Sequence, residues 1–396
     1  MRARVHIVAG DVLCGAGRGL DPFWHSMMRA QPLQARHDLG DARLAATYVA
    51  VPERGEPDGD FATAWLTSVC RNALDQARES ISHFAQPRIA LLVGSSLGGM
   101  TLFEAHHRTT WNATRAGDPG MPTTQAPAWQ ARYDGPTRAA AERLGLPVSA
   151  WTLNTACSSA ANALGIARRW LSHGRIDVAL VAGIDVISPF VYAGFASLRA
   201  IDEEPTSPFS AGRRGLNLGE AAVSLVLMRA TDLAEPTSLV ELAGFGSSCD
   251  AHHLTRPDPS GAGLARAMHA ALANGNARAD QVALLSAHAT GTPFNDSMES
   301  AAFAQVFGNH APAMHAAKPV AGHTLGAAGA VDAVLVWQAL VRGVIPPTFR
   351  RLAPDETLAL QPLAKPQPLA SGSLALSTSS GFGGSNVALL FRGGVA

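Results

Sequence analysis

Short apolar runs alternate with alanine-rich amphipathic stretches along most of the chain. The runs predict strands at 5–10, 89–96, 178–185, 221–228, 282–290, 374–384 and 386–391. The amphipathic stretches predict helices at 61–82, 137–144, 158–173, 261–274, 298–307 and 326–342. Because these strands are apolar throughout and alternate with helices, the pattern indicates an α/β fold whose sheets are covered on both faces.

The polar, helix-breaking segment 228–238 separates two portions of the chain. A chain of 396 residues is long for one ordinary core, so residues 1–232 and 233–396 are expected to form two halves. The stretch 105–135 is polar and contains prolines and glycines. It therefore predicts a long loop or an irregular helical excursion.

Composition and charge argue against several classes of protein. Lys and Arg together number 31, as do Asp and Glu, and a formal net charge of zero argues against nucleic acid or an anionic membrane as the main partner. No apolar run is long enough to span a membrane, and the N-terminal run is too short for a signal peptide, which favours a cytoplasmic protein. The four cysteines lie far apart, a spacing that suggests neither a zinc ribbon nor a disulfide scaffold.

The stretch "LNTACSSAANALGIARRW" (153–170) places a single cysteine where an extended segment turns into a helix. Cys157 would lie at or just before the helix N-terminus, where free backbone N–H groups and the helix dipole favour an anion. A thiol in that place is expected to ionise more easily than a free one and to act as a nucleophile. The alternative interpretation is a small buried apolar residue in a tight turn.

Two histidines, a lysine and a phenylalanine supply further candidate chemistry in the C-terminal portion. His288 ends a predicted strand in "SAHATGTPFNDSMES", and His323 lies in a glycine turn of "KPVAGHTLGAAG", five residues after Lys318. Phe382 is flanked by glycines in "SSGFGGSN". Taken singly, the two histidines are explained as hydrogen-bonded core residues, Lys318 as a solvated lysine, and Phe382 as a side chain that fills a turn. Their shared setting in Gly- and Ala-rich strand ends instead indicates one site for a thiolate, a base and an oxyanion.

Four motifs, "TACSSA", "HATGTPFND", "KPVAGHTLGAAG" and "GFGGSN", occur in that order. They resemble the motifs of the β-ketoacyl synthase (condensing enzyme) family of the thiolase superfamily. Further matches, including "GSSLGGM" (94–100) and "SPFSAGRRGLNLGEAAVSLVL" (207–227), extend the resemblance over nearly the whole chain. It implies a thiolase-like fold, in which two pseudo-repeated halves form an α-β-α-β-α layered sandwich, together with a dimer and a Cys-His-His active site.

The resemblance also implies a decarboxylative condensation of carrier-bound thioesters. Cys157 would take an acyl chain from the phosphopantetheine arm of an acyl carrier protein. The carbanion left by decarboxylation of malonyl carrier protein would then attack this acyl group. His288 and His323 would donate hydrogen bonds to the malonyl thioester carbonyl, and the backbone N–H groups of Cys157 and Phe382 would form a second oxyanion hole. Because decarboxylation drives the reaction, no metal or redox cofactor is expected.

Supporting roles follow from the same resemblance. Lys318 would organise His288 through a carboxylate, taken to be Glu299, and Phe382 would act as a gate that moves on acylation. The remaining matches concern substrate contacts: Leu97 in the acyl pocket, Thr290 and Thr292 on the pantetheine arm, His253 and Thr255 in the wall of the site, and Arg199, Arg213 and Arg214 in the docking of an acidic carrier protein.

Several departures from the family pattern indicate a specialised member. Asn154 stands where relatives often carry Asp, Ala289 follows His288 where glycine is common, and Pro319 replaces a serine. A left-handed backbone at Ala289 would cost energy. Fatty acid synthesis and specialised pathways such as those of aryl polyenes or other polyketides are the expected contexts. The expected partner is a second copy or a related synthase subunit.

Alternative functions fit the sequence less well than a condensing enzyme does. A non-elongating scaffold or decarboxylase subunit of a heterodimeric synthase is the main alternative, and the intact set of Cys157, His288, Lys318 and His323 favours the condensing enzyme over it. A cysteine hydrolase is disfavoured because no carboxylate or amide partner for a histidine is recognisable. The stretch "CDAHH" (249–253) is interpreted as part of the wall of the site and not as a metal centre.

Overall fold

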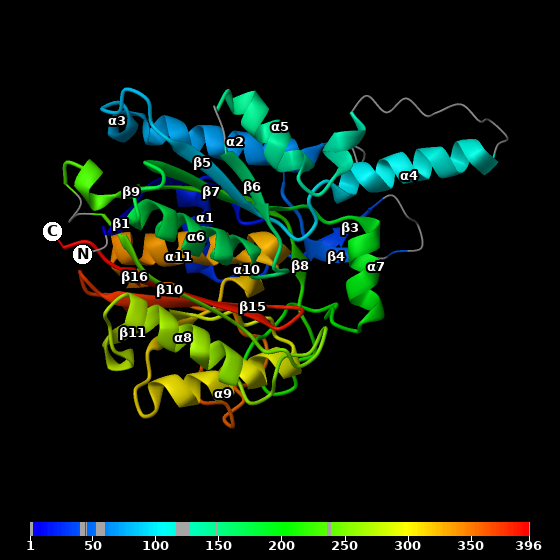
Figure 1. Ribbon diagram of the computed structural model, residues 1–396. Helices are drawn as coiled ribbons and strands as arrows, with labels where there is room; N and C mark the ends of the chain where they lie inside the picture. Colours follow the sequence, from blue (N-terminus) through cyan, green and yellow to red (C-terminus); the bar gives the residue numbers. More distant parts are fainter. Residues whose placement is uncertain are drawn as a thin grey trace.

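The structure is a computed structural model that describes residues 3–39, 44, 46–52, 60–115, 127–146, 149–235 and 239–395. Within these residues, helices and sheets alternate in five layers (Figure 1). The central layer consists of α6 (Ser159–Ser172) and α11 (Ala328–Arg342), which contact strands above and below them. This is the α-β-α-β-α sandwich expected from the sequence.

The N-terminal portion contributes the upper sheet of Figure 1. Its strands lie in the order β1-β9-β7-β5-β6. Their bounds are β1 (Val5–Cys14), β5 (Ile89–Gly94), β6 (Ser149–Leu153), β7 (Val178–Asp185) and β9 (Ala221–Arg229). β5 is parallel to β6 and β7, whereas β9 is antiparallel to β7 and β1.

The C-terminal portion repeats this arrangement in the order β10-β16-β15-β11-β12. The bounds are β10 (Glu241–Cys249), β11 (Val282–Ser286), β12 (Ala313–His315), β15 (Leu374–Gly381) and β16 (Ser385–Arg392). In both portions the first strand lies next to the last, and the second lies between the third and the fourth. The two halves therefore share one topology. They join edge to edge where His6 of β1 pairs with Glu241 of β10.

Two pairs of helices cover the outer faces of these sheets (Figure 1). α2 (Phe61–Gln76) and α5 (Gly135–Leu144) lie on the N-terminal side, and α8 (Ala262–Asn274) and α9 (Pro293–Phe307) lie on the C-terminal side. Because strands such as β7 are covered on both faces, every one of its residues is buried. This burial explains why the strands read as apolar runs in the sequence.

The predicted elements agree with the observed ones except at specific positions. The helix predicted at 61–82 is α2 followed by the short α3 (Arg78–Ile81). α9 starts at Pro293, before the predicted start at 298, because proline is well tolerated in the first turn of a helix. Of the ten strands named above, β6, β10 and β12 lie outside the predicted ranges, since β6 is exposed or half-buried throughout, β10 is rich in Gly and Ser, and β12 is very short.

The remaining elements are short or peripheral. The helices are α1 (Leu20–Arg29), α4 (Met100–Arg115), α7 (Pro189–Ser197) and α10 (Lys318–Ala321). The 3₁₀ turns are η1 (Ala128–Ala131), η2 (Ala230–Asp232), η4 (Ala279–Gln281) and η5 (Leu325–Ala327). The short strands are β2 (Gly17–Arg18), β3 (Ala35–His37), β4 (Ala46–Val49), β8 (Leu218–Gly219), β13 (Val344–Ile345) and β14 (Gln367–Pro368).

The excursion predicted at 105–135 contains more regular helix than a loop would. Its first part belongs to α4, which projects from the body of the protein (Figure 1), and its last part includes η1. Residues 116–126 of this stretch lie outside the described residues. Elsewhere, the helix Leu325–Arg342 is long and apolar enough to cross a membrane, but 89% of it is buried inside the protein, as in a core helix.

Candidate active site

Cys157 lies in the turn between β6 and α6. The Oδ1 atom of Asn154 shapes this turn by accepting a hydrogen bond from the backbone N–H of Ala156 at 3.0 Å. Ala156 has a left-handed backbone with a φ of 50°, and α6 begins two residues after the cysteine. A Cβ atom at Gly94 of β5 would lie 2.2 Å from the backbone nitrogen of Ala160, so glycine there lets the helix begin close to the sheet. The cysteine thus precedes a helix, as the sequence predicts.

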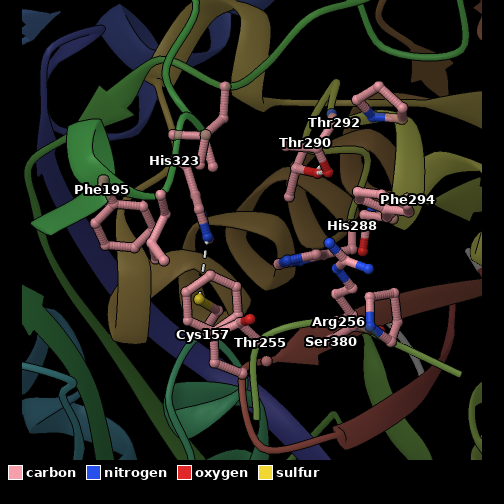
Figure 2. A pocket seen from close by; sticks show the side chains of 18 of the residues that line it. Cys157, Phe195, Thr255, Arg256, His288, Thr290, Thr292, Phe294, His323 and Ser380 are labelled. Carbon is pink, nitrogen blue, oxygen red and sulfur yellow. Dashed lines mark hydrogen bonds between the residues drawn. The ribbon is translucent and has the colours of Figure 1, made fainter. Parts of the chain in front are cut away.

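Both candidate histidines lie beside Cys157. The Nε2 atom of His323 is 3.1 Å from the Sγ atom of Cys157, a contact drawn as a dashed line in Figure 2. The ring centroids of His288 and His323 are 5.2 Å apart, with the two planes nearly perpendicular. These three side chains and Phe382 line one cavity of about 410 Å³. The fold therefore brings together groups that are far apart in the sequence.

Lys318 forms its ion pair with Asp332, whereas Glu299, the carboxylate expected to connect it with His288, is affected by its charge without an ion pair to it. The Nζ atom of Lys318 is 3.4 Å from the Oδ2 atom of Asp332, and the two side chains are 3% and 1% exposed. Lys318 is the first residue of α10, and Asp332 lies in the second turn of α11. The pair holds a buried positive charge that lowers the pKa of both neighbouring histidines and of the Cys157 thiol.

Both histidine rings are neutral at pH 7. Burial lowers the pKa of His288 and of His323 well below the usual value, and the charge of Lys318 lowers both further. The Nδ1 atom of each ring is buried without a hydrogen-bond partner among the described residues. A neutral imidazole has one N–H and one lone pair, so Nε2 of His323 can accept the thiol proton or, in the other tautomer, donate its own.

The pKa of the Cys157 thiol differs from the sequence-based expectation. Burial raises this pKa to about 12, whereas the position before a helix had predicted easier ionisation. The loss of hydration of a thiolate outweighs the effect of the helix end. Lys318 and the backbone N–H groups of Phe382 and Cys157 oppose the shift without reversing it. The resting thiol therefore keeps its proton, and His323 is the neighbouring base.

The same two backbone N–H groups are those expected to form an oxyanion hole. They belong to Cys157 itself and to Phe382, which follows β15. The ring of Phe382 is 39% exposed and stacks on Phe195 of α7 with 5.8 Å between ring centroids. Both rings line the cavity, so a movement of Phe382 would change the space beside the sulfur.

Glu299 is completely buried on α9 and holds the His288 segment directly. Its carboxylate accepts hydrogen bonds from the backbone N–H groups of His288 at 2.8 Å and of Ala289 at 2.6 Å. Ala289 has a φ of 45°, a left-handed conformation that is costly for any residue other than glycine. Burial and the neighbouring Asp296 raise the pKa of Glu299 to about 7. Glu299 thus positions His288 through the backbone and not through contact with Lys318.

Not all of the expected substrate contacts lie at the cavity. Thr290 and Thr292 line it with their hydroxyl oxygens 2.9 Å apart, and Thr255 lines it as well. Leu97 and His253 are not among its lining residues. Leu97 instead packs against the apolar cluster beneath α7, and the Nδ1 atom of His253 accepts the backbone N–H of Thr255 at 3.1 Å. Neither residue lines this cavity, so the roles of Leu97 in an acyl pocket and of His253 in the wall stay predictions.

The three arginines expected at the docking surface have different surroundings. Arg199 and Arg214 line the cavity, and Arg214 pairs with Asp202 at 2.7 Å. Arg213 is 8% exposed and pairs with Asp355 at 2.7 Å and with Asp296 at 3.4 Å. The prediction for Arg213 is wrong, because a buried guanidinium between two carboxylates has no free charge to offer a carrier protein.

Sequence reasoning missed several buried carboxylates, among them Asp332 and Asp185. Asp185 accepts the backbone N–H of Leu97 at 2.9 Å and that of Gly326 at 2.6 Å, which ties the turn after β5 to the segment that follows His323. Burial raises the pKa of Asp185 to about 6. The available signal was a single acid in each of the apolar stretches "VALVAGID" and "AGAVDAVL", because buried acids require partners. Among the described residues, no group of three or more His, Cys, Asp and Glu side chains is arranged to hold a metal ion.

Comparison with known proteins agrees with this geometry. Residues 31–233 match the family model "Beta-ketoacyl synthase, N-terminal domain", and residues 239–350 match "Beta-ketoacyl synthase, C-terminal domain". The 3-oxoacyl-[acyl-carrier-protein] synthase 2 of Synechocystis sp. is 29% identical over 99% of this chain and 98% of its own length. Nodulation protein E of Rhizobium meliloti is 31% identical over 99% of this chain and all of its own length.

Among solved structures, a chain from the complex of a ketosynthase with its chain length factor from Xenorhabdus doucetiae is similar throughout. It matches with a TM-score of 0.84 and 30% identity, over 100% of this chain and 98% of that chain. The two family models together cover most of the sequence, including the segments that carry the cysteine and both histidines. The chain therefore belongs to the beta-ketoacyl synthase family.

Proposed function

We propose that this protein is a 3-oxoacyl-[acyl-carrier-protein] synthase that condenses a malonyl thioester with an acyl chain held on Cys157. The observation that carries the proposal is the 3.1 Å contact between the Nε2 atom of His323 and the Sγ atom of Cys157, in a cavity that also holds His288. A neutral base beside a protonated thiol is an arrangement suited to nucleophilic catalysis. The relatives named 3-oxoacyl-[acyl-carrier-protein] synthase 2 support the same reaction.

In the first half-reaction, Cys157 takes the acyl group from an acyl carrier protein. His323 accepts the thiol proton while the sulfur attacks the thioester carbonyl, and the resulting oxyanion lies between the N–H groups of Cys157 and Phe382. The carbon–sulfur bond to the carrier then breaks, and its thiolate leaves with the proton held by His323. The products are an acyl-cysteine and a carrier protein with a free thiol.

In the second half-reaction, malonyl carrier protein occupies the cavity and loses CO₂. The enolate oxygen that forms accepts hydrogen bonds from His288 and His323, whose neutral rings each supply one N–H. The enolate carbon attacks the acyl group on Cys157, the bond to the cysteine sulfur breaks, and the thiolate regains a proton from solvent. The product is a 3-oxoacyl chain that is two carbons longer and remains on the carrier.

The proposal requires no metal or redox cofactor, because decarboxylation supplies the carbanion and no electron leaves the substrates. Both substrates arrive on the phosphopantetheine arm of a carrier protein in the cytoplasm. Thr290 and Thr292, with hydroxyls in the wall of the cavity, are proposed to hold this arm through its amides. The chain length and the starter group are left open by this assignment.

A related synthase subunit is part of the proposal as a second partner. The similar Xenorhabdus structure is the complex of a ketosynthase with its chain length factor, and another similar structure is the ishigamide ketosynthase/chain length factor, at 26% identity and a TM-score of 0.87. The alternative function, a non-elongating scaffold or decarboxylase subunit, has the same relatives. The contact of Cys157 with His323 favours the condensing enzyme over this alternative.

Intact-protein mass spectrometry tests the function. We expect incubation with a panel of acyl carrier proteins to add the acyl mass to the wild type and not to Cys157→Ala. Malonyl carrier protein should then remove that mass and yield a 3-oxoacyl carrier protein. Absence of acyl mass for every chain length would contradict the proposal and favour the scaffold function, and acylation of the alanine variant would exclude Cys157 as the nucleophile.

A further inference from the structure

The cavity carries an arginine–aromatic pair that the catalytic chemistry does not use. The guanidinium carbon of Arg256 lies 5.0 Å from the ring centroid of Phe294, and Figure 2 shows the two side chains beside each other in the wall of the cavity. Phe294 is 59% exposed, whereas Cys157, which lines the same cavity, is 7% exposed. The pair therefore lies at the solvent end of the cavity, and the sulfur lies at its buried end.

Arg256 has a free charge. Among the described residues no carboxylate pairs with its side chain, whereas Arg214 in the same cavity is bound to Asp202 at 2.7 Å. Stacking uses the flat face of a guanidinium and leaves the N–H donors at its edge available. Phe294 thus holds Arg256 in place without occupying its donors. A planar fork of free donors matches the geometry of a phosphate group.

Two threonines of the same cavity complete the pattern. Thr290 and Thr292 follow His288 along the chain and line the same wall, and Phe294 comes two residues later. Cys157 and Thr290 are buried, Thr292 is half-buried and Arg256 is exposed, so the wall offers a thiol and hydroxyl groups towards its buried end and a guanidinium at its solvent end. A ligand with a thioester at one end, amides in its middle and a phosphate at its other end complements this order.

We infer that Arg256, held by Phe294, binds the phosphate of the phosphopantetheine arm while the thioester reaches Cys157. This inference rests on the proposed function, because it needs Cys157 to accept an acyl group. The same phosphate occurs in two sources, the phosphodiester of a carrier protein and the arm of coenzyme A. The pair thereby distinguishes phosphorylated thioesters from unphosphorylated ones.

The test compares two small thioesters that differ only in the phosphate, acyl-pantetheine and acyl-4′-phosphopantetheine. The rate of Cys157 acylation is followed by intact mass. The wild type should react about three to five times faster with the phosphorylated compound, the size expected of an exposed ion pair. This advantage should shrink as NaCl rises, since exposed charges are screened. In Arg256→Gln the ratio of the two rates should fall to about one, and this ratio is the readout because it cancels any effect of the variant that is common to both compounds.

Arg138→Gln is the matched control, because Arg138 also stacks on an aromatic ring, that of Trp129 at 4.5 Å, but does not line the cavity. It should keep the full preference, and Phe294→Ala should lose part of it. Equal rates for both compounds in the wild type, or an unchanged preference in Arg256→Gln, would overturn the inference. If no thioester acylates the wild type, the proposed function itself fails. To identify the source of the phosphate, the acylation rates with acyl carrier protein and with acyl-coenzyme A are compared between the wild type and Arg256→Gln. The source that the site serves is the one whose rate falls in the variant.

Discussion

The ammonium group of Lys318 lies 3.4 Å from the Oδ2 atom of Asp332, with both side chains removed from solvent. An unpaired charge in such a place is very costly, so each group depends on the other. The charge of Lys318 also lowers the pKa of both histidines and of the Cys157 thiol. The pair therefore combines a structural requirement with an electrostatic effect on the reacting groups.

The first prediction separates the contribution of the Lys318–Asp332 pair to stability from its electrostatic effect on the reacting groups. Lys318→Ala and Asp332→Ala should each lower the free energy of unfolding by about 3–5 kcal/mol, because each leaves a buried charge without its partner. The double variant Lys318→Met/Asp332→Leu should recover most of this stability, as measured by urea denaturation. Its acylation rate should nevertheless stay at least about tenfold below the wild type, since the pKa of Cys157 rises further. Full recovery of the rate would show that Lys318 acts only through packing.

The second prediction concerns ionisation of Cys157. Since burial raises the pKa of this thiol to about 12, its alkylation by iodoacetamide should accelerate from pH 7 to pH 10 without a plateau. Peptide mass spectrometry separates this signal from that of the exposed Cys249. A plateau below pH 8.5 would indicate a stabilised thiolate and contradict the prediction.

His323→Ala should slow acylation at pH 7 by a factor of about 10²–10⁴, the usual range for loss of a general base.

Glu299 gives the third prediction, on pH and stability. Burial raises its pKa to about 7, above the unfolded value, so its contribution to stability is present below about pH 4.3 and is lost as pH rises through about 7. The free energy of unfolding of the wild type, minus that of Glu299→Gln, should therefore fall by roughly 4 kcal/mol over this window. Denaturation of both proteins at several pH values measures this difference. A difference that is constant with pH would refute the raised pKa.

The fourth prediction concerns backbone strain beside His288. Ala289 has a φ of 45°, a conformation that costs a non-glycine residue about 1–2 kcal/mol. Ala289→Gly should leave the protein as stable as the wild type or more so, because relief of strain offsets the lost methyl group. Ala287→Gly, also buried but without a positive φ, serves as control and should destabilise by about 1 kcal/mol or more. Equal thermal shifts for both variants would argue against strain at Ala289.

Prediction from sequence worked best where local pattern carries the information. The turn before α6 lies where its motif placed it, and His288 and Phe382 lie one or two residues after the ends of β11 and β15, because backbone geometry there depends on neighbouring residues. It failed for Arg213, whose two carboxylate partners come from distant segments of the chain. Lys318 was expected to act through Glu299, but its ion pair is formed with Asp332 of the helix α11.

The amino-acid sequence by itself determined the family, the layered α/β architecture and the set of Cys157, His288, His323 and Lys318, since motifs and apolar periodicity are local properties. Only the tertiary structure decided how these groups behave. Burial decided that the thiol keeps its proton and that both histidines are neutral, because the hydration of a charge depends on everything packed around it. Long-range packing also placed His323 against the sulfur and Arg256 over Phe294, contacts that no spacing in the chain encodes.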